Sequence, residues 1–205
     1  MASMRLTTTT KWMILSFSIA ALIAIEIRLT YGPSERMNTA LRATARWSFV
    51  LFWLSTVGSA LRTLLGTRFN RLAAHARDLG LSFASAHLVH LGLVVWMFVV
   101  SQPDLTRQTI VVFGVAVIWT YLLALLSFTE ISRVFGARTA RILRLVGVEY
   151  ITVAFFIDFN KDAFDGGLNR IGYYAPFLIL TVAGPLLRMA AAIRRITRGS
   201  ALVAS

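Results

Sequence analysis

The chain has 205 residues, of which 57% are hydrophobic and 15% charged, whereas soluble globular domains have about 25% charged residues. Its net charge of +12 comes from arginines clustered at the ends of long apolar runs, where the positive-inside rule expects them. The basic balance therefore does not indicate nucleic-acid binding. Cysteine is absent, which excludes disulfides, thiolate catalysis and cysteine-ligated metal centres. This composition is typical of a polytopic membrane protein in a lipid bilayer.

Six runs of the sequence are apolar enough to cross a bilayer as helices. In chain order, the predicted spans are 12–27, 47–65, 79–100, 109–127, 145–159 and 171–187. The third and fourth are the clearest, whereas the first is short and the fifth contains Glu149 and ends beside Asp158. We expect an all-α fold in which residues 1–205 form a single domain, a bundle of six transmembrane helices.

Lysine and arginine predict the orientation of this bundle. The two terminal segments and the loops after the second and fourth spans carry about twice as many of these residues as the other three loops. With an even number of spans, both termini lie on the same side of the membrane. The positive-inside rule makes that side cytoplasmic, so we expect a multi-pass protein of the cell (inner) membrane.

The third span, LGLSFASAHLVHLGLVVWMFVV, has no formal charge but contains His87 and His90. Residues three apart share a helix face, and both lie about 13–18 Å past Asp78, the last charge before the span. An ionisable group at that depth faces the protein interior, a cavity or a cofactor. Two interpretations stay open: neutral imidazoles hydrogen-bonded within the bundle, or axial ligands of a b-type haem.

Three segments resemble parts of the ferric reductase-like transmembrane family. ARWSFVLFWL (45–54) and RDLGLSFASAHLVHLGLV (77–94) are similar to its second and third helices, and SFTEISRVFGARTARILRLVGVEYI (127–151) is similar to its fourth-to-fifth helix connection. That family includes ferric reductases, NADPH oxidases and the haem-binding membrane subunit of the bacterial periplasmic methionine sulfoxide reductase system. The resemblance implies a helix bundle that transfers electrons through haem b.

The same resemblance assigns candidate haem ligands and shows where this chain departs from the family. His90 stands at the family's ligand position in the third helix, and His87 lies one turn nearer the helix start. The family's partner histidines come from the fifth helix, where this chain has Arg144 and Ile157. A bis-histidine haem between the third and fifth helices is therefore not expected. His90 or His87 could hold a five-coordinate haem, another side chain or a second chain could supply the sixth ligand, or the scaffold has lost its haem.

Glu149 is a carboxylate inside the fifth predicted span, five residues after Arg144. One interpretation is structural, with the two long side chains pairing near the cytoplasmic interface. The other is functional, with Glu149 binding a proton or a quinol in a cavity. An intramembrane carboxylate makes the functional hypothesis worth testing.

We expect an electron-transfer component that is at most the membrane subunit of an oxidoreductase, because we predict no flavin or nicotinamide domain in this chain. Its electrons would come from a quinol or a separate reductase, and a membrane or periplasmic protein would be its partner. Two alternatives stay open. One is a haem-free structural or accessory subunit of a membrane complex, and the other is a small proton-coupled transporter that uses Glu149 and the histidine pair.

Overall fold

The computed structural model describes residues 2–32, 35–104, 106–128, 133–164 and 168–203. The regular elements within these residues are all helical, which confirms the predicted all-α class. They are α1 (Ala2–Thr30), α2 (Arg36–Leu65), the 3-10 helix η1 (Thr67–Phe69), α3 (Asn70–Ala74), α4 (Ala76–Ser101), α5 (Arg107–Leu126), α7 (Ala137–Phe164) and α8 (Leu168–Val203).

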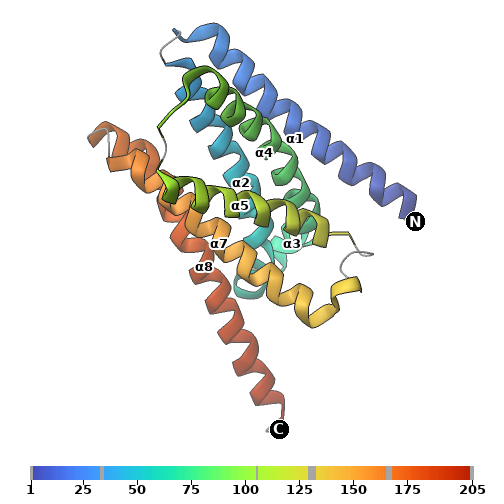
Figure 1. The fold of residues 1–205 in the computed structure, drawn as a ribbon. Coiled ribbons are helices and arrows are strands. Elements are labelled where there is room, and N and C mark those ends of the chain that lie inside the picture. The colour runs from blue at the N-terminus through green and yellow to red at the C-terminus, as the bar shows by residue number, and fades with distance from the viewer. Residues whose placement is uncertain (1, 33–34, 105, 129–132, 165–167, 204–205) are drawn as a thin grey trace.

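The long helices form two groups. In the first, α4 packs against α1 and α2, and in the second, α7 packs against α5 and α8. Helix α2 also contacts α8 and so joins the groups. The two ends of the chain lie toward the side of the bundle where α7 begins (Figure 1).

Five helices in the described part of the chain are long and apolar enough to cross a membrane. They cover the first four predicted spans and the last, apart from Ser127 at the end of the fourth, and they indicate a protein that resides in a lipid bilayer. The fifth predicted span, 145–159, lies in α7, which is not among the five. Glu149 interrupts the apolar run of α7, and Arg144 and Asp158 flank that run. A crossing by α7 therefore stays a prediction.

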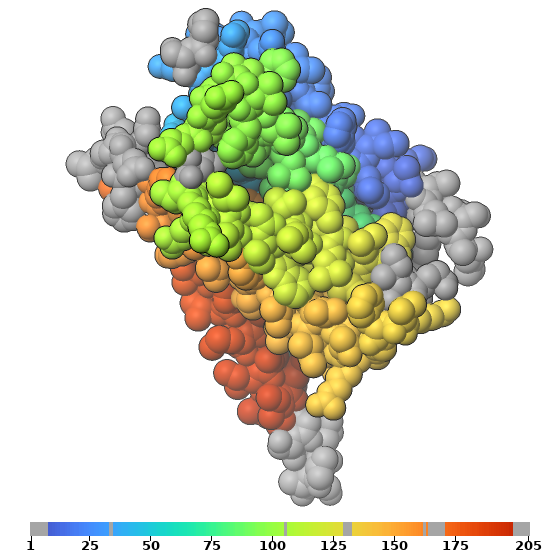
Figure 2. Space-filling model, in the orientation of Figure 1, coloured from blue at the N-terminus to red at the C-terminus, as the bar shows by residue number. Residues whose placement is uncertain are grey.

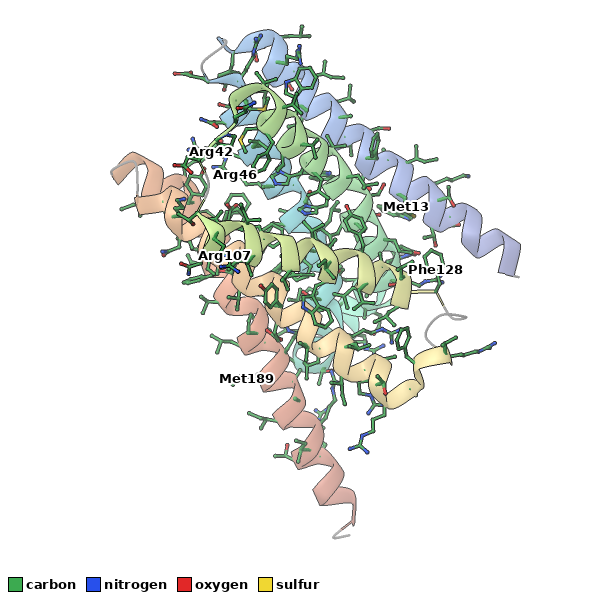
Figure 3. All side chains as sticks on the ribbon, in the orientation of Figure 1. Met13, Arg42, Arg46, Arg107, Phe128 and Met189 are labelled. Carbon is green, nitrogen blue, oxygen red and sulfur yellow. The ribbon has the colours of Figure 1, made fainter. Side chains whose placement is uncertain are left out.

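Helix α2 begins at Arg36, well before the predicted span start at residue 47, and Arg46 in this added part has aromatic partners inside the protein. The guanidinium carbon of Arg46 lies 4.2 Å from the ring centroid of Tyr173 and 4.3 Å from that of Tyr174. Figure 3 shows Arg46 at the end of the bundle where α8 begins. These cation–π contacts let a charged residue continue the helix.

Helix α8 is also longer than predicted and continues through Pro185. Proline removes one helical hydrogen bond, which neighbouring helices can offset in a membrane protein. The indole Nε1 of Trp53 donates to the carbonyl oxygen of Leu180 at 2.9 Å, close to the break in the ladder. A side chain of α2 therefore supports α8 where the proline weakens it.

Aromatic rings form the core between α2, α4 and α7. Phe49 is fully buried, and its ring centroid lies 5.0 Å from that of Phe155 and 5.1 Å from that of Phe159. Phe52 extends the cluster to Phe83 of α4 at 5.2 Å. Aromatic pairs at such distances contribute about 0.5–1.5 kcal/mol each beyond their buried area.

The exterior is apolar along much of the bundle. On α1, the side chains of Ile14, Leu22 and Leu29 are 61%, 63% and 80% exposed. Figure 2 shows α1 along one edge of the molecule. An apolar surface of this extent suits contact with lipid rather than water.

Candidate functional site

His87 and His90 lie half-buried on α4, next to the aromatic core. Their rings stack with centroids 5.2 Å apart and planes 19° from parallel, as residues on one helix face can do. The ring of His87 also lies 5.5 Å from that of Phe83. The structure therefore brings the two imidazoles together and connects them to the core.

Thr44 of α2 fixes the orientation of the His90 ring. Its Oγ1 lies 3.2 Å from Nδ1 of His90, and its hydroxyl donates to the carbonyl oxygen of Ala40 at 2.8 Å. While the single hydroxyl hydrogen of Thr44 is donated to Ala40, Thr44 accepts the second bond from the Nδ1–H of His90. This tautomer leaves a lone pair on Nε2, the form in which imidazole binds metals. Nothing in the sequence marked Thr44 as the partner.

His87 is less well satisfied than His90. Its Nδ1 is buried and has no hydrogen-bond partner among the residues that the structure describes. A buried polar atom without a partner costs about 1–3 kcal/mol, so such atoms are rare in native proteins. The described helices therefore provide a hydrogen-bond partner for Nδ1 of His90 but none for Nδ1 of His87.

The side chains between α4 and α7 do not fit the haem that the family resemblance implies. Phe155 of α7 lies 6.3 Å from Phe83 and 5.8 Å from Phe52, so these rings fill the space that a macrocycle would need. The stacked histidines project from one helix and cannot ligate opposite faces of one iron. In the part of the chain that is described, no group of three or more histidines and carboxylates could hold a metal ion.

Glu149 pairs with Arg188 of α8, not with Arg144 as the sequence suggested. Nε and Nη2 of Arg188 donate to the two carboxylate oxygens at 3.0 and 2.8 Å. Nη1 of Arg188 also reaches Oγ1 of Thr56 at 3.4 Å, which brings α2 into the contact. Both oxygens of Glu149 are thus used in an ion pair, so in this conformation the carboxylate acts as a structural anion.

Arg144 instead binds the end of α5. Its Nη2 donates to the carbonyl oxygen of Leu126 at 2.6 Å, one of the carbonyls that the last turn of a helix leaves unpaired. The expected pair with Glu149 was wrong because residues five apart differ by about 140° around a helix. Arg144 faces α5 whereas Glu149 faces α8.

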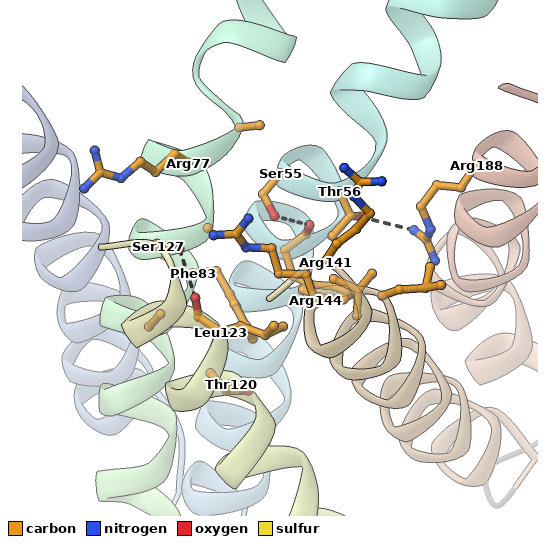
Figure 4. A pocket seen from close by; sticks show the side chains of 16 residues that line it. Ser55, Thr56, Arg77, Phe83, Thr120, Leu123, Ser127, Arg141, Arg144 and Arg188 are labelled. Atoms are coloured by element: carbon orange, nitrogen blue, oxygen red, sulfur yellow. Dashed lines mark hydrogen bonds between the residues drawn. The ribbon is translucent and has the colours of Figure 1, made fainter. Parts of the chain in front are cut away.

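A cleft opens between α2, α4, α5, α7 and α8, on the side where α7 begins (Figure 4). Its volume is about 620 Å³. Aromatic and aliphatic side chains form its apolar part: Phe52, Phe83, Leu123, Leu145 and Val148. Four arginines also line it: Arg77, Arg141, Arg144 and Arg188. Sequence reasoning counted these arginines as topology signals and missed the cleft, because they come from three different helices.

Comparison of the chain with protein-family models, with curated proteins and with solved structures found no match. The likeness to the ferric reductase-like family therefore rests on the three segments of sequence, and the site has to be interpreted from its own geometry.

Proposed function

We propose that this chain is a haem-free accessory component of a membrane complex that keeps the helix order of the ferric reductase-like family. Three observations support the proposal. The three similar segments occur in the family's order, five helices are apolar enough to span a bilayer, and phenylalanines occupy the space between α4 and α7. The packed phenylalanines are the decisive observation, because a bundle that binds haem between α4 and α7 would need that space for the cofactor.

In this proposal α7 is the sixth crossing. It packs between α5 and α8, and two of its charged side chains have partners inside the bundle, Arg144 on the Leu126 carbonyl and Glu149 on Arg188. Charges in a transmembrane helix are tolerated when they are paired in this way. Six crossings place both termini on one side, and the excess of arginine there makes that side the cytoplasm of a cell (inner) membrane protein.

An absorbance measurement tests the haem-free assignment. The protein would be produced with ample haem, purified in detergent and scanned oxidised and then reduced with dithionite, with pyridine haemochrome quantification. We expect no b-type α-band from folded protein. A band near one haem per chain that is lost in His90→Ala would overturn the proposal. His75→Ala, which changes an exposed histidine outside the predicted span, is the matched control.

Electron transfer is the second candidate function, and the bond between Thr44 and His90 favours it. With the Nδ1–H of His90 bonded to Thr44, the lone pair is on Nε2, which is the tautomer that a metal ligand needs. In this case a quinol or a separate reductase would supply the electrons. The same spectrum decides between the two functions, because only the second requires a reducible chromophore.

A further inference from the structure

The cleft among α2, α4, α5, α7 and α8 has the size and the divided chemistry of a ligand site. Its volume of about 620 Å³ lies within the range of about 300–1,000 Å³ that is common for small-molecule pockets. Phe52 and Phe83 give it an apolar wall, and Ser55 and Thr120 add hydroxyl groups. Gly80 opens the wall on α4, since a Cβ there would meet only Ser55, at 3.9 Å. The cleft can therefore take a ligand with an apolar part and a polar part.

Positive charge dominates the polar part of this cleft. Glu149 compensates Arg188, but no carboxylate is among the described residues that line the cleft. Arg77 stacks over Phe128 with its guanidinium carbon 5.9 Å from the ring, and Arg144 donates to a backbone carbonyl, so neither charge is neutralised by a carboxylate among the described residues. Arg141 is exposed and makes no ion pair with any described residue. Figure 4 shows the Arg141 and Arg144 side chains beside each other.

Three arginines of the cleft lie next to the apolar runs of their helices, at a position that would suit a lipid headgroup. Arg77 is the second residue of α4, Arg141 and Arg144 are the fifth and eighth residues of α7, and all three precede the apolar runs of these helices. Phe52 and Phe83 lie within the apolar runs of α2 and α4. A molecule with a charged head and an apolar chain would match this order. Arginine suits phosphate in particular, because its guanidinium donates two parallel hydrogen bonds.

We propose that this cleft binds an anionic phospholipid, with its phosphate group held by Arg77, Arg141 and Arg144 and its acyl chain along Phe52 and Phe83. The lipid comes from the leaflet on the side of the chain termini. The site does not depend on whether the bundle carries haem, so the proposal goes beyond the accessory function.

Binding of short-chain lipids to the full-length protein in neutral detergent tests the proposal. Dioctanoyl phosphatidylglycerol is the probe, dioctanoyl phosphatidylcholine is the zwitterionic control, and inorganic phosphate represents a free anion. Bound lipid is counted by native mass spectrometry, and affinity is measured from the shift in thermal unfolding temperature. We expect phosphatidylglycerol to bind at one site and phosphatidylcholine to bind at least about tenfold more weakly.

Arg141→Gln is the main variant, because this side chain makes no ion pair in the described structure that its loss would break. We expect it to weaken phosphatidylglycerol binding about fivefold to tenfold, as for loss of a charge-assisted hydrogen bond. Arg138→Gln is the matched control, since Arg138 is an exposed arginine of α7 that does not line the cleft. Gly80→Leu fills the cleft without changing charge and should also weaken binding.

Each result bears directly on the lipid site. Selective binding that Arg141→Gln and Gly80→Leu weaken while Arg138→Gln leaves it unchanged supports the proposal. Equal binding of the two lipids overturns it, and so does equal weakening by Arg138→Gln. If inorganic phosphate binds as tightly as phosphatidylglycerol and Gly80→Leu has no effect, the cleft is a site for a soluble anion and the lipid assignment is wrong.

Discussion

The helices α1, α2 and α4 are joined by hydrogen bonds from hydroxyl, indole and imidazole groups, one of them to the carboxylate of Asp78. The helices α5, α7 and α8 are joined to each other and to α2 largely through arginines. In the first group, Ser16 of α1 donates to the carbonyl of Ser82 and Ser85 donates to that of Met13, both at 3.0 Å. In the second, Arg188 pairs with Glu149, and Arg194 donates to the carbonyl of Leu64 at 2.6 Å.

The two groups also differ in the residues that let their helices approach each other. Buried small residues such as Ala20, Ser82 and Ala86 let the helices of the first group approach closely. The cleft lies where the two groups meet, with α2 and α4 on one side and α5, α7 and α8 on the other. Its polar part is lined by arginines of α4, α7 and α8.

The largest expected effect comes from the ring that joins the two groups. Phe49 of α2 is fully buried against Phe155 and Phe159 of α7. Phe49→Ala should lower the free energy of unfolding by about 3–5 kcal/mol through lost transfer energy and a cavity. Denaturant titration of the detergent-solubilised protein, followed by tryptophan fluorescence, measures it. Phe98→Ala, at a side chain that is 39% exposed, should have a much smaller effect, and equal effects would contradict the described core.

A substitution at Gly147 tests how closely α7 approaches α5. A Cβ at this position would lie 2.7 Å from Cε3 of Trp119 on α5, so the indole would have to move. We expect Gly147→Ala to destabilise the protein by about 1–3 kcal/mol, the usual cost of overpacking, and to change tryptophan fluorescence. Gly114→Ala should be neutral or stabilising, because no other side chain or neighbouring helix lies within 4 Å of the place that its new methyl group would take. A neutral Gly147→Ala would mean that α5 and α7 are more loosely packed than described.

The ion pair between Arg188 and Glu149 can be used to test how much the charged contacts contribute to stability. The side chains are 18% and 39% exposed, so solvent screens their attraction. In a double-mutant cycle with Arg188→Gln and Glu149→Gln we expect a coupling energy of about 1 kcal/mol. The same cycle with Arg144→Gln in place of Arg188→Gln should give no coupling. If Glu149 is coupled to Arg144 and not to Arg188, the pair of Arg144 and Glu149 that the sequence suggested is the correct one.

The smallest expected effect belongs to the hydrogen bond between Thr44 and His90. Such bonds in membrane proteins contribute about 0.6 kcal/mol on average. Thr44→Val should destabilise the first group by about that amount and should change the chemical shift of the His90 imidazole nitrogens. Thr63→Val, at a half-buried threonine that bonds only within its own helix, is the control. An unchanged His90 signal would show that the ring is not held by α2.

Much of the helix content could be predicted, because the length of an apolar run is local information. The span expected at 79–100 lies within α4, and the one at 109–127 matches α5 to within about two residues. The ends of α2 and α8 could not be predicted in this way. Arg46 is accommodated by two tyrosines more than a hundred residues later, and the ladder near Pro185 is supported by Trp53.

The sequence by itself determined that this is an all-helical membrane protein with two histidines on one face of a charge-free helix, since both follow from residue spacing along one segment. Only the tertiary structure decided that Glu149 meets Arg188, that Thr44 orients His90, and that arginines of α4, α7 and α8 surround one cleft. These contacts depend on which helices become neighbours and on the direction each side chain takes around its helix axis. Residues 39 or 46 positions apart are brought together by the packing of whole helices.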